Sequence, residues 1–152
     1  MMEIKCEHQK ERSAFISLLM LADESEAAVR RYLEDGEVYT FSYDGEIVGI
    51  MLIVELDSTI IEIKNMAVVA SFRGKGIGRQ MIESIEKKVR NSGYRIILVG
   101  TSNSSIGNLM FYQKCGFRFE AIKKDFFLDY PEPFYENGIR GLDMVMLKKE
   151  LV

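Results

Sequence analysis

Residues 58–100 hold the pattern that most restricts the fold, because a strand, a glycine-rich turn, a helix and a second strand follow one another there. The run 58–69 is strand-like, and Arg73-Gly74-Lys75-Gly76-Ile77-Gly78 comes soon after it. Apolar side chains then recur at helical spacing over residues 76–91. The run "RIILVG", residues 95–100, is apolar throughout, as strands buried on both faces are. The succession predicts a mixed α/β fold.

The rest of the chain adds helices and strands on either side of this unit. Patterns typical of helices cover residues 8–21, 24–34 and 104–115, the last closed by Gly116. Patterns typical of strands cover two runs around the hairpin signal Asp44-Gly45, then residues 117–128 and 142–149. We expect the order α α β β β α β α β β in a single domain spanning residues 1–152.

Composition and charge exclude several classes of protein. A chain of 152 residues can bury a core, and 47% hydrophobic with 28% charged residues is typical of a soluble globular protein. The net charge of −3 argues against a nucleic-acid partner, which would require a basic face. No apolar run is long enough to cross a membrane, and the N-terminus has no signal-peptide pattern. We therefore expect a cytoplasmic protein with no membrane partner.

Metal and thiol chemistry have little support in the sequence. Cys6 and Cys115 lie far apart, and His8 is the only histidine. No spacing suits a zinc site, so we expect no metal. A Cys115–His8 pair is arithmetically allowed, but Cys115 as a small apolar core residue and His8 as an exposed residue are the better interpretation.

The glycine-rich turn has the composition of an anion site. A helix start offers unpaired N–H groups and the positive end of the helix dipole, and glycines let a phosphate approach them. Arg73, Lys75 and Arg79 add positive charge. The spacing fits neither a Walker loop nor a Rossmann loop. The alternative is a glycine-rich turn without a ligand, which the three glycines and three cations disfavour.

Two further features flank this turn. In the run 58–69, the apolar residues Ile61 and Ile63 stand at odd-numbered positions, whereas Met66 and Val68 stand at even-numbered positions. Such a change in the phase of the apolar alternation across Lys64-Asn65 predicts a β-bulge. The alternative is a strand buried on both faces. In "NLMFYQKCGF", residues 108–117, Asn108 and Tyr112 share a helical face. A tyrosine there could protonate a thiolate leaving group, although helix tyrosines more often fill the core.

Together these features resemble the GCN5-related N-acetyltransferase (GNAT) superfamily, most clearly over residues 38–120. The family's pyrophosphate loop, [RQ]-x-x-G-x-[GA], is matched by residues 73–78, and its tyrosine helix followed by Gly-Phe is matched by residues 112–117. The resemblance implies a mixed, mostly antiparallel sheet that splays at a β-bulge, with helices on both faces. Residues 58–69 and 94–100 would form the two arms of the splayed region.

The resemblance also implies an acetyltransferase that uses acetyl-CoA as donor. Backbone groups of Ala67 and Val68 would pair with the pantetheine, and the loop of Arg73, Gly74, Lys75, Gly76, Ile77 and Gly78 would hold the pyrophosphate. Tyr112 would protonate the CoA thiolate after direct attack of an acceptor amine in a ternary complex. Relatives often have an asparagine seven residues before the tyrosine; Ser105 stands there, and Asn103 or Asn108 could take over its role.

The general base and the acceptor are less defined. Some relatives have a glutamate where Glu62 stands, and the alternative is an amine that loses its proton to water. The acceptor site would combine the two N-terminal helices with the segment 125–143, which is rich in acids and aromatics. Acids beside aromatics suit a cationic amine, and an ordinary surface loop is the alternative. The acidic residues of the segment 125–143 are Asp125, Asp129, Glu132, Glu136 and Asp143.

Two other functions stay open at this point. An acyl-CoA-binding or regulatory module without turnover would keep the loop and could lose Tyr112. A nucleotide-binding protein is disfavoured by the loop spacing. The resemblance also allows a homodimer.

Overall fold

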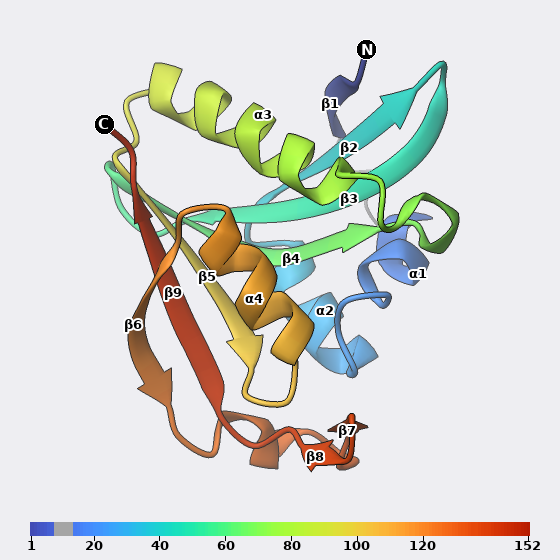
Figure 1. Ribbon diagram of the computed structural model, residues 1–152, viewed down its shortest axis with the longest axis vertical. Helices are drawn as coiled ribbons and strands as arrows, with labels where there is room; N and C mark the ends of the chain where they lie inside the picture. Colours follow the sequence, from blue (N-terminus) through green and yellow to red (C-terminus); the bar gives the residue numbers. More distant parts are fainter. Residues whose placement is uncertain (8–13) are drawn as a thin grey trace.

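The computed structural model describes residues 1–7 and 14–152, and a seven-stranded sheet forms its centre (Figure 1). The sheet has the strand order β1-β2-β3-β4-β5-β9-β6. Its strands are β1 (Glu3–Glu7), β2 (Glu37–Tyr43), β3 (Glu46–Glu55), β4 (Ile60–Val68), β5 (Ile96–Ser102), β6 (Arg118–Lys123) and β9 (Met144–Glu150). Neighbouring strands are antiparallel except β4 and β5, which are parallel and joined through a helical crossover.

Helices cover both faces of the sheet, as expected (Figure 1). The helices are α1 (Ile16–Leu19), α2 (Glu26–Leu33), α3 (Ile77–Asn91) and α4 (Ile106–Lys114), with 3₁₀ turns η2 (Ala70–Phe72) and η3 (Phe126–Asp129). Apolar residues of α1 and α2 pack with Val38, Ile50 and Leu52. The buried stripe of α3 packs on the other face with residues of β2 to β5 and with Tyr112 of α4. The mixed α/β fold is thus confirmed.

The predicted bulge lies in β4. Leu52 of β3 pairs with Asn65, whereas the next residue, Ile53, pairs with Ile63, so Lys64 has no partner across the ladder. The extra residue restores the phase: Ile63 and Met66 both contribute to the core on the α3 side. This change of phase is the pattern read from the sequence.

The arms of β4 and β5 separate just beyond this bulge. The parallel pairing runs from Ile60 with Ile96 to Ile63 with Val99 and ends there. Beyond it β4 continues to Val68 on β3, while β5 continues to Ser102 on β9. Each arm therefore keeps one neighbour, and the sheet opens between them as expected.

Several short elements differ from the sequence expectations. Strand β1 was not expected from the sequence, because its five residues are mostly exposed and polar and show no apolar alternation. The strand expected over 117–128 ends at Lys123, since Asp125 has a φ of 60° and begins the 3₁₀ turn η3. A hairpin of β7 (Tyr135–Glu136) and β8 (Ile139–Arg140) turns at Asn137-Gly138 and was not expected. The helix expected over 8–21 lies partly outside the described residues. His8, which was expected to be exposed, lies wholly outside them.

Candidate active site

A cavity of about 770 Å³ lies where β4 ends and α3 begins. Its walls come from the end of β4, the glycine-rich turn, the first residues of α3 and the facing side of α4. Most of the residues expected to bind a cofactor line it, namely Ala67, Val68, Arg73, Gly74, Gly76, Ile77, Gly78 and Asn108. We call this cavity the groove.

The glycine-rich turn presents an uncapped helix start to the groove. Gly74 and Gly76 have φ values of 76° and 77°, which side chains other than glycine rarely adopt. A Cβ atom built on either residue meets no protein atom within 4 Å, so this side of the turn is open. Gly76 is the N-cap of α3 and provides no side-chain cap, which leaves backbone N–H groups of the first turn for an anion.

The other residues of the turn have structural contacts. Arg73 donates from Nε to the carbonyl oxygen of Val68 at 3.1 Å, which ties the turn to the end of β4. Lys75 is not part of the groove wall; its Nζ lies 5.5 Å from the centre of the Phe72 ring. A Cβ on Gly78 would come within 3.0 Å of the Phe111 ring, so this glycine allows α3 and α4 to pack closely.

A second cavity of about 150 Å³ adjoins the groove, and we call it the inner cavity. Tyr112, Asn108, Met66 and Glu136 are among the residues that line both. The inner cavity lies at the opening between β4 and β5 and takes walls from the turn before α2 and from the segment 127–136. Besides Tyr112, the acids and aromatics on its wall are Asp23, Glu24, Glu136, Phe127, Tyr130 and Phe134.

Tyr112 is the only buried residue of α4, and it belongs to the core. Its ring packs edge-on against Phe111 and Phe117, with centroid distances of 5.2 and 5.6 Å. Burial raises the pKa of Tyr112 well above its ordinary value, and the proximity of Cys115 adds to this. The phenol therefore stays protonated at neutral pH, which is the form a proton donor needs.

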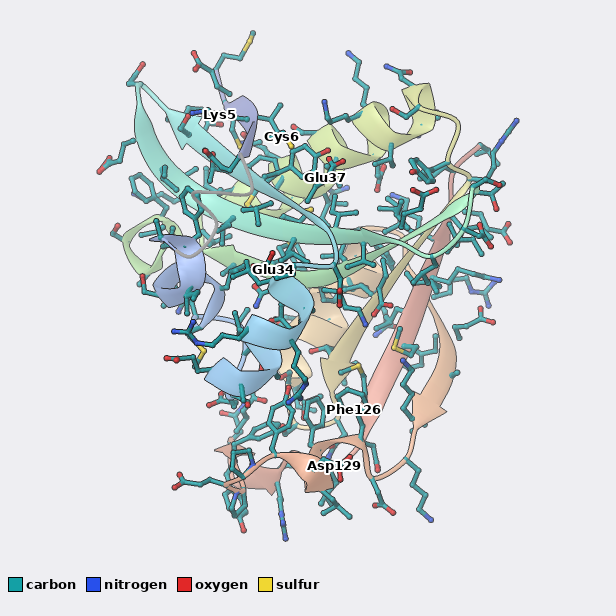
Figure 2. All side chains as sticks on the ribbon, turned by 180° about the vertical axis from the view of Figure 1, so that it is seen from behind. Lys5, Cys6, Glu34, Glu37, Phe126 and Asp129 are labelled. Carbon is teal, nitrogen blue, oxygen red and sulfur yellow. The ribbon has the colours of Figure 1, made fainter. Side chains whose placement is uncertain are left out.

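Asp23 joins the N-terminal helices to the late segment. Its carboxylate accepts hydrogen bonds from Tyr32 Oη at 3.0 Å and from Tyr130 Oη at 2.9 Å. Burial, with the Asp23 charge as a second cause, raises the pKa of both tyrosines. Figure 2 labels Phe126 and Asp129 in this late segment and Glu34 at the C-terminal end of α2. The late segment lies toward the other end of α2. The two regions expected to form one site are therefore in contact.

The three polar candidates near α4 have different positions. Asn103 lies outside the groove wall and accepts from the N–H groups of Leu142 and Asp143 at 2.8 and 3.0 Å, so its side chain holds the chain before β9. Ser105 lines the inner cavity. Asn108 lines both cavities and donates to Thr101 Oγ1 at 3.3 Å.

The two glutamates near the site also differ in position. Glu62 is buried, is not part of either wall and lies 3.4 Å from Lys64 Nζ. Glu136 lines both cavities, although in the sequence it is only one of several acids of the late segment. The signal that could have distinguished it is the Asn137-Gly138 turn directly after it, which predicts a hairpin and hence a defined direction for its neighbours.

The two cysteines have different positions. Cys115 is buried in the core and also lines the groove, and burial raises the pKa of its thiol; Cys6 is exposed. Among residues 1–7 and 14–152, no three His, Cys, Asp or Glu side chains gather to hold a metal ion. Over the same residues, no helix has the length and apolarity that a membrane span requires.

Comparison with known proteins agrees with this architecture. The sequence model of the acetyltransferase (GNAT) family matches residues 6–117. The chain is 44% identical over 135 residues to the uncharacterized N-acetyltransferase YvbK of Bacillus subtilis, covering 88% of this chain and 87% of that protein.

Solved structures agree as well. A GNAT family acetyltransferase from Elizabethkingia anophelis with acetyl-CoA bound superimposes with a TM-score of 0.91 at 40% identity, over 99% of this chain and 98% of that one. A Bacillus subtilis acetyltransferase in complex with CoA has a TM-score of 0.89 at 40% identity over 100% of both chains. Fold, groove and sequence matches define an enzyme of the acetyltransferase class. The chain belongs to the acetyltransferase (GNAT) family.

Proposed function

We propose that this acetyltransferase moves the acetyl group of acetyl-CoA to a primary amine of a small molecule or protein, by direct attack in a ternary complex. The observation that carries the proposal is the pair of adjoining cavities with Tyr112 in the wall of both. The groove would hold the donor and the inner cavity the acceptor. The thioester would then lie beside Tyr112, whose hydroxyl would protonate the departing thiolate.

In this proposal the donor is held mainly by backbone groups. The loop 73–78 would bind the pyrophosphate at the start of α3, and Ala67 and Val68 would pair with the pantetheine along the open edge of β4. That edge lacks a β5 neighbour because the parallel ladder ends at Ile63. Asn108 is the better of the two asparagine candidates for a pantetheine contact, because Asn103 is not part of the groove wall.

The acceptor is proposed to be a cationic amine. Asp23, Glu24 and Glu136 line the inner cavity, and no ion pair within the described part of the chain involves any of them. Lys64 also lines the cavity, but its charge is paired with Glu62. The net charge of the wall is therefore negative, and aromatic rings lie beside it.

Ligand-dependent melting tests the donor. Acetyl-CoA and CoA should raise the melting temperature by mass action, while ATP and NAD should do so much less, because they offer no pantetheine to the edge of β4. Equal melting-temperature shifts from ATP and CoA would indicate a general phosphate site instead of a CoA-specific donor site.

A thiol-release assay with acetyl-CoA across an amine panel tests the reaction. A diamine should react faster than the monoamine of the same chain length and faster than the amino acid that adds a carboxylate. Donor binding without thiol release for any amine would favour the alternative, an acyl-CoA-binding module without turnover.

A further inference from the structure

We infer that Glu136 is the general base that takes the proton from the acceptor nitrogen, an inference that rests on the proposed acetyl transfer. Glu136 belongs to the β7–β8 hairpin, yet its side chain reaches the walls of both cavities, where Tyr112 and Asn108 also lie. A base must lie where the acceptor nitrogen meets the thioester carbon, and this shared wall is that region.

Two buried serines fix the position of the Glu136 carboxylate. Ser104 Oγ and Ser105 Oγ donate to the same oxygen, Oε1, at 2.8 and 2.6 Å. Ser104 is in turn 2.7 Å from Ser102 Oγ, and Ser105 is the N-cap of α4. Within the described residues no hydrogen bond reaches Oε2, so this oxygen is left to accept a proton from a substrate.

Glu62, the base suggested by the family resemblance, has a different environment. Its carboxylate is buried outside both cavity walls, and Oε1 lies 3.4 Å from Lys64 Nζ. Lys64 is the bulged residue of β4, so this ion pair lies at the bulge where the β4–β5 ladder ends. Glu62 is therefore the rival assignment in the experiment below.

The reaction balances with two proton carriers. The acceptor ammonium gives one proton to Glu136 Oε2, which passes it to solvent. The neutral nitrogen attacks the thioester carbon, so that a C–N bond forms while the C–S bond breaks. Tyr112 protonates the departing sulfur and recovers a proton from the new amide nitrogen. The products are the N-acetyl compound, the CoA thiol and one proton.

The test compares Glu136→Gln with the unmodified protein on two probe amines, ethylamine and trifluoroethylamine. Glutamine keeps an oxygen for the two serines but is not a base. The nitrogen of trifluoroethylamine is already mostly neutral at pH 7, so it depends less on a base. With ethylamine kcat should fall about 10²-fold, whereas with trifluoroethylamine the loss should stay below about tenfold.

A purely structural role of Glu136 would lower both rates equally, and that result would overturn the inference. An acceptor-dependent loss in Glu62→Gln but not in Glu136→Gln would overturn it as well, in favour of Glu62. Glu34→Gln is the control, since Glu34 is exposed at the end of α2 (Figure 2) and should leave both rates unchanged. If the unmodified protein acetylates no amine at all, this inference and the proposed function fail together.

Discussion

At the scale of single residues, Tyr112 combines a core position with access to both cavities. Its ring is held by Phe111 and Phe117, and no hydrogen bond among residues 1–7 and 14–152 involves its hydroxyl, so packing sets the hydroxyl direction. A substitution that keeps the ring can therefore separate catalysis from stability.

Tyr112→Phe should lower kcat about 10²-fold or more, because it removes only the hydroxyl proposed to protonate the thiolate. The dissociation constant of CoA should change little, since the proposed donor contacts lie in the turn and on β4. Steady-state kinetics and calorimetric CoA titration measure the two quantities. Turnover within a factor of a few of the unmodified protein would assign the proton to water or to another group.

At the scale of elements, the turn between β4 and α3 is the proposed binding site for the donor's pyrophosphate. The turn needs left-handed backbone at Gly74 and Gly76, and the bulge at Lys64 opens the strand edge beside it. In the proposed function both features bind the same donor, because only the short η2 turn separates the end of β4 from the glycine-rich turn.

Gly76→Ala should weaken CoA binding by about tenfold or more, because a Cβ would intrude on the proposed phosphate site and strain the positive φ. The strain alone costs about 1 kcal/mol. Gly45→Ala is the matched control: Gly45 also has a positive φ, 80°, and open space around it, but lies in the β2–β3 hairpin away from the groove. Both variants should lose similar stability in urea, and only Gly76→Ala should lose CoA affinity. Unchanged CoA affinity in Gly76→Ala would show that the phosphate binds outside this turn.

At the scale of the whole molecule, several tyrosines at the candidate site are also buried by the fold. Burial is the largest cause that raises the pKa of Tyr32, Tyr39, Tyr112 and Tyr130 in the folded protein. Three of them line the inner cavity or contact Asp23, so the site and the stability of the fold are linked.

The free energy of unfolding should therefore fall as the pH rises above about 10, the ordinary tyrosine pKa. The sign follows from proton binding: the folded state holds its phenol protons where the unfolded state releases them, so stability is full below that pH and declines above it. Urea unfolding at neutral pH and at increasingly alkaline pH measures the effect. Tyr112→Phe should show a weaker decline, and a flat profile in the unmodified protein would contradict the pKa shifts.

The sequence by itself determined the local devices of this protein. The change of phase across Lys64-Asn65, the glycine-rich turn at a helix start and the hairpin at Asp44-Gly45 were all readable, because each depends on a few neighbouring residues. The two motifs around Gly76 and Tyr112 were sufficient for the family. The cofactor and catalytic roles of individual residues stay predictions.

Only the tertiary structure decided which distant residues share a site. Glu136 reaches Ser104 and Ser105 across more than thirty residues, and Tyr130 reaches Asp23 across 107. Neither contact has a local pattern, because packing of the whole sheet and its helices brings the segments together. The polar edge strand β1 was missed for the same reason: pairing with β2, rather than its own apolar alternation, makes it a strand. Periodicity records the neighbours of a residue along the chain, whereas the inner cavity is lined by residues that only the folded chain brings together.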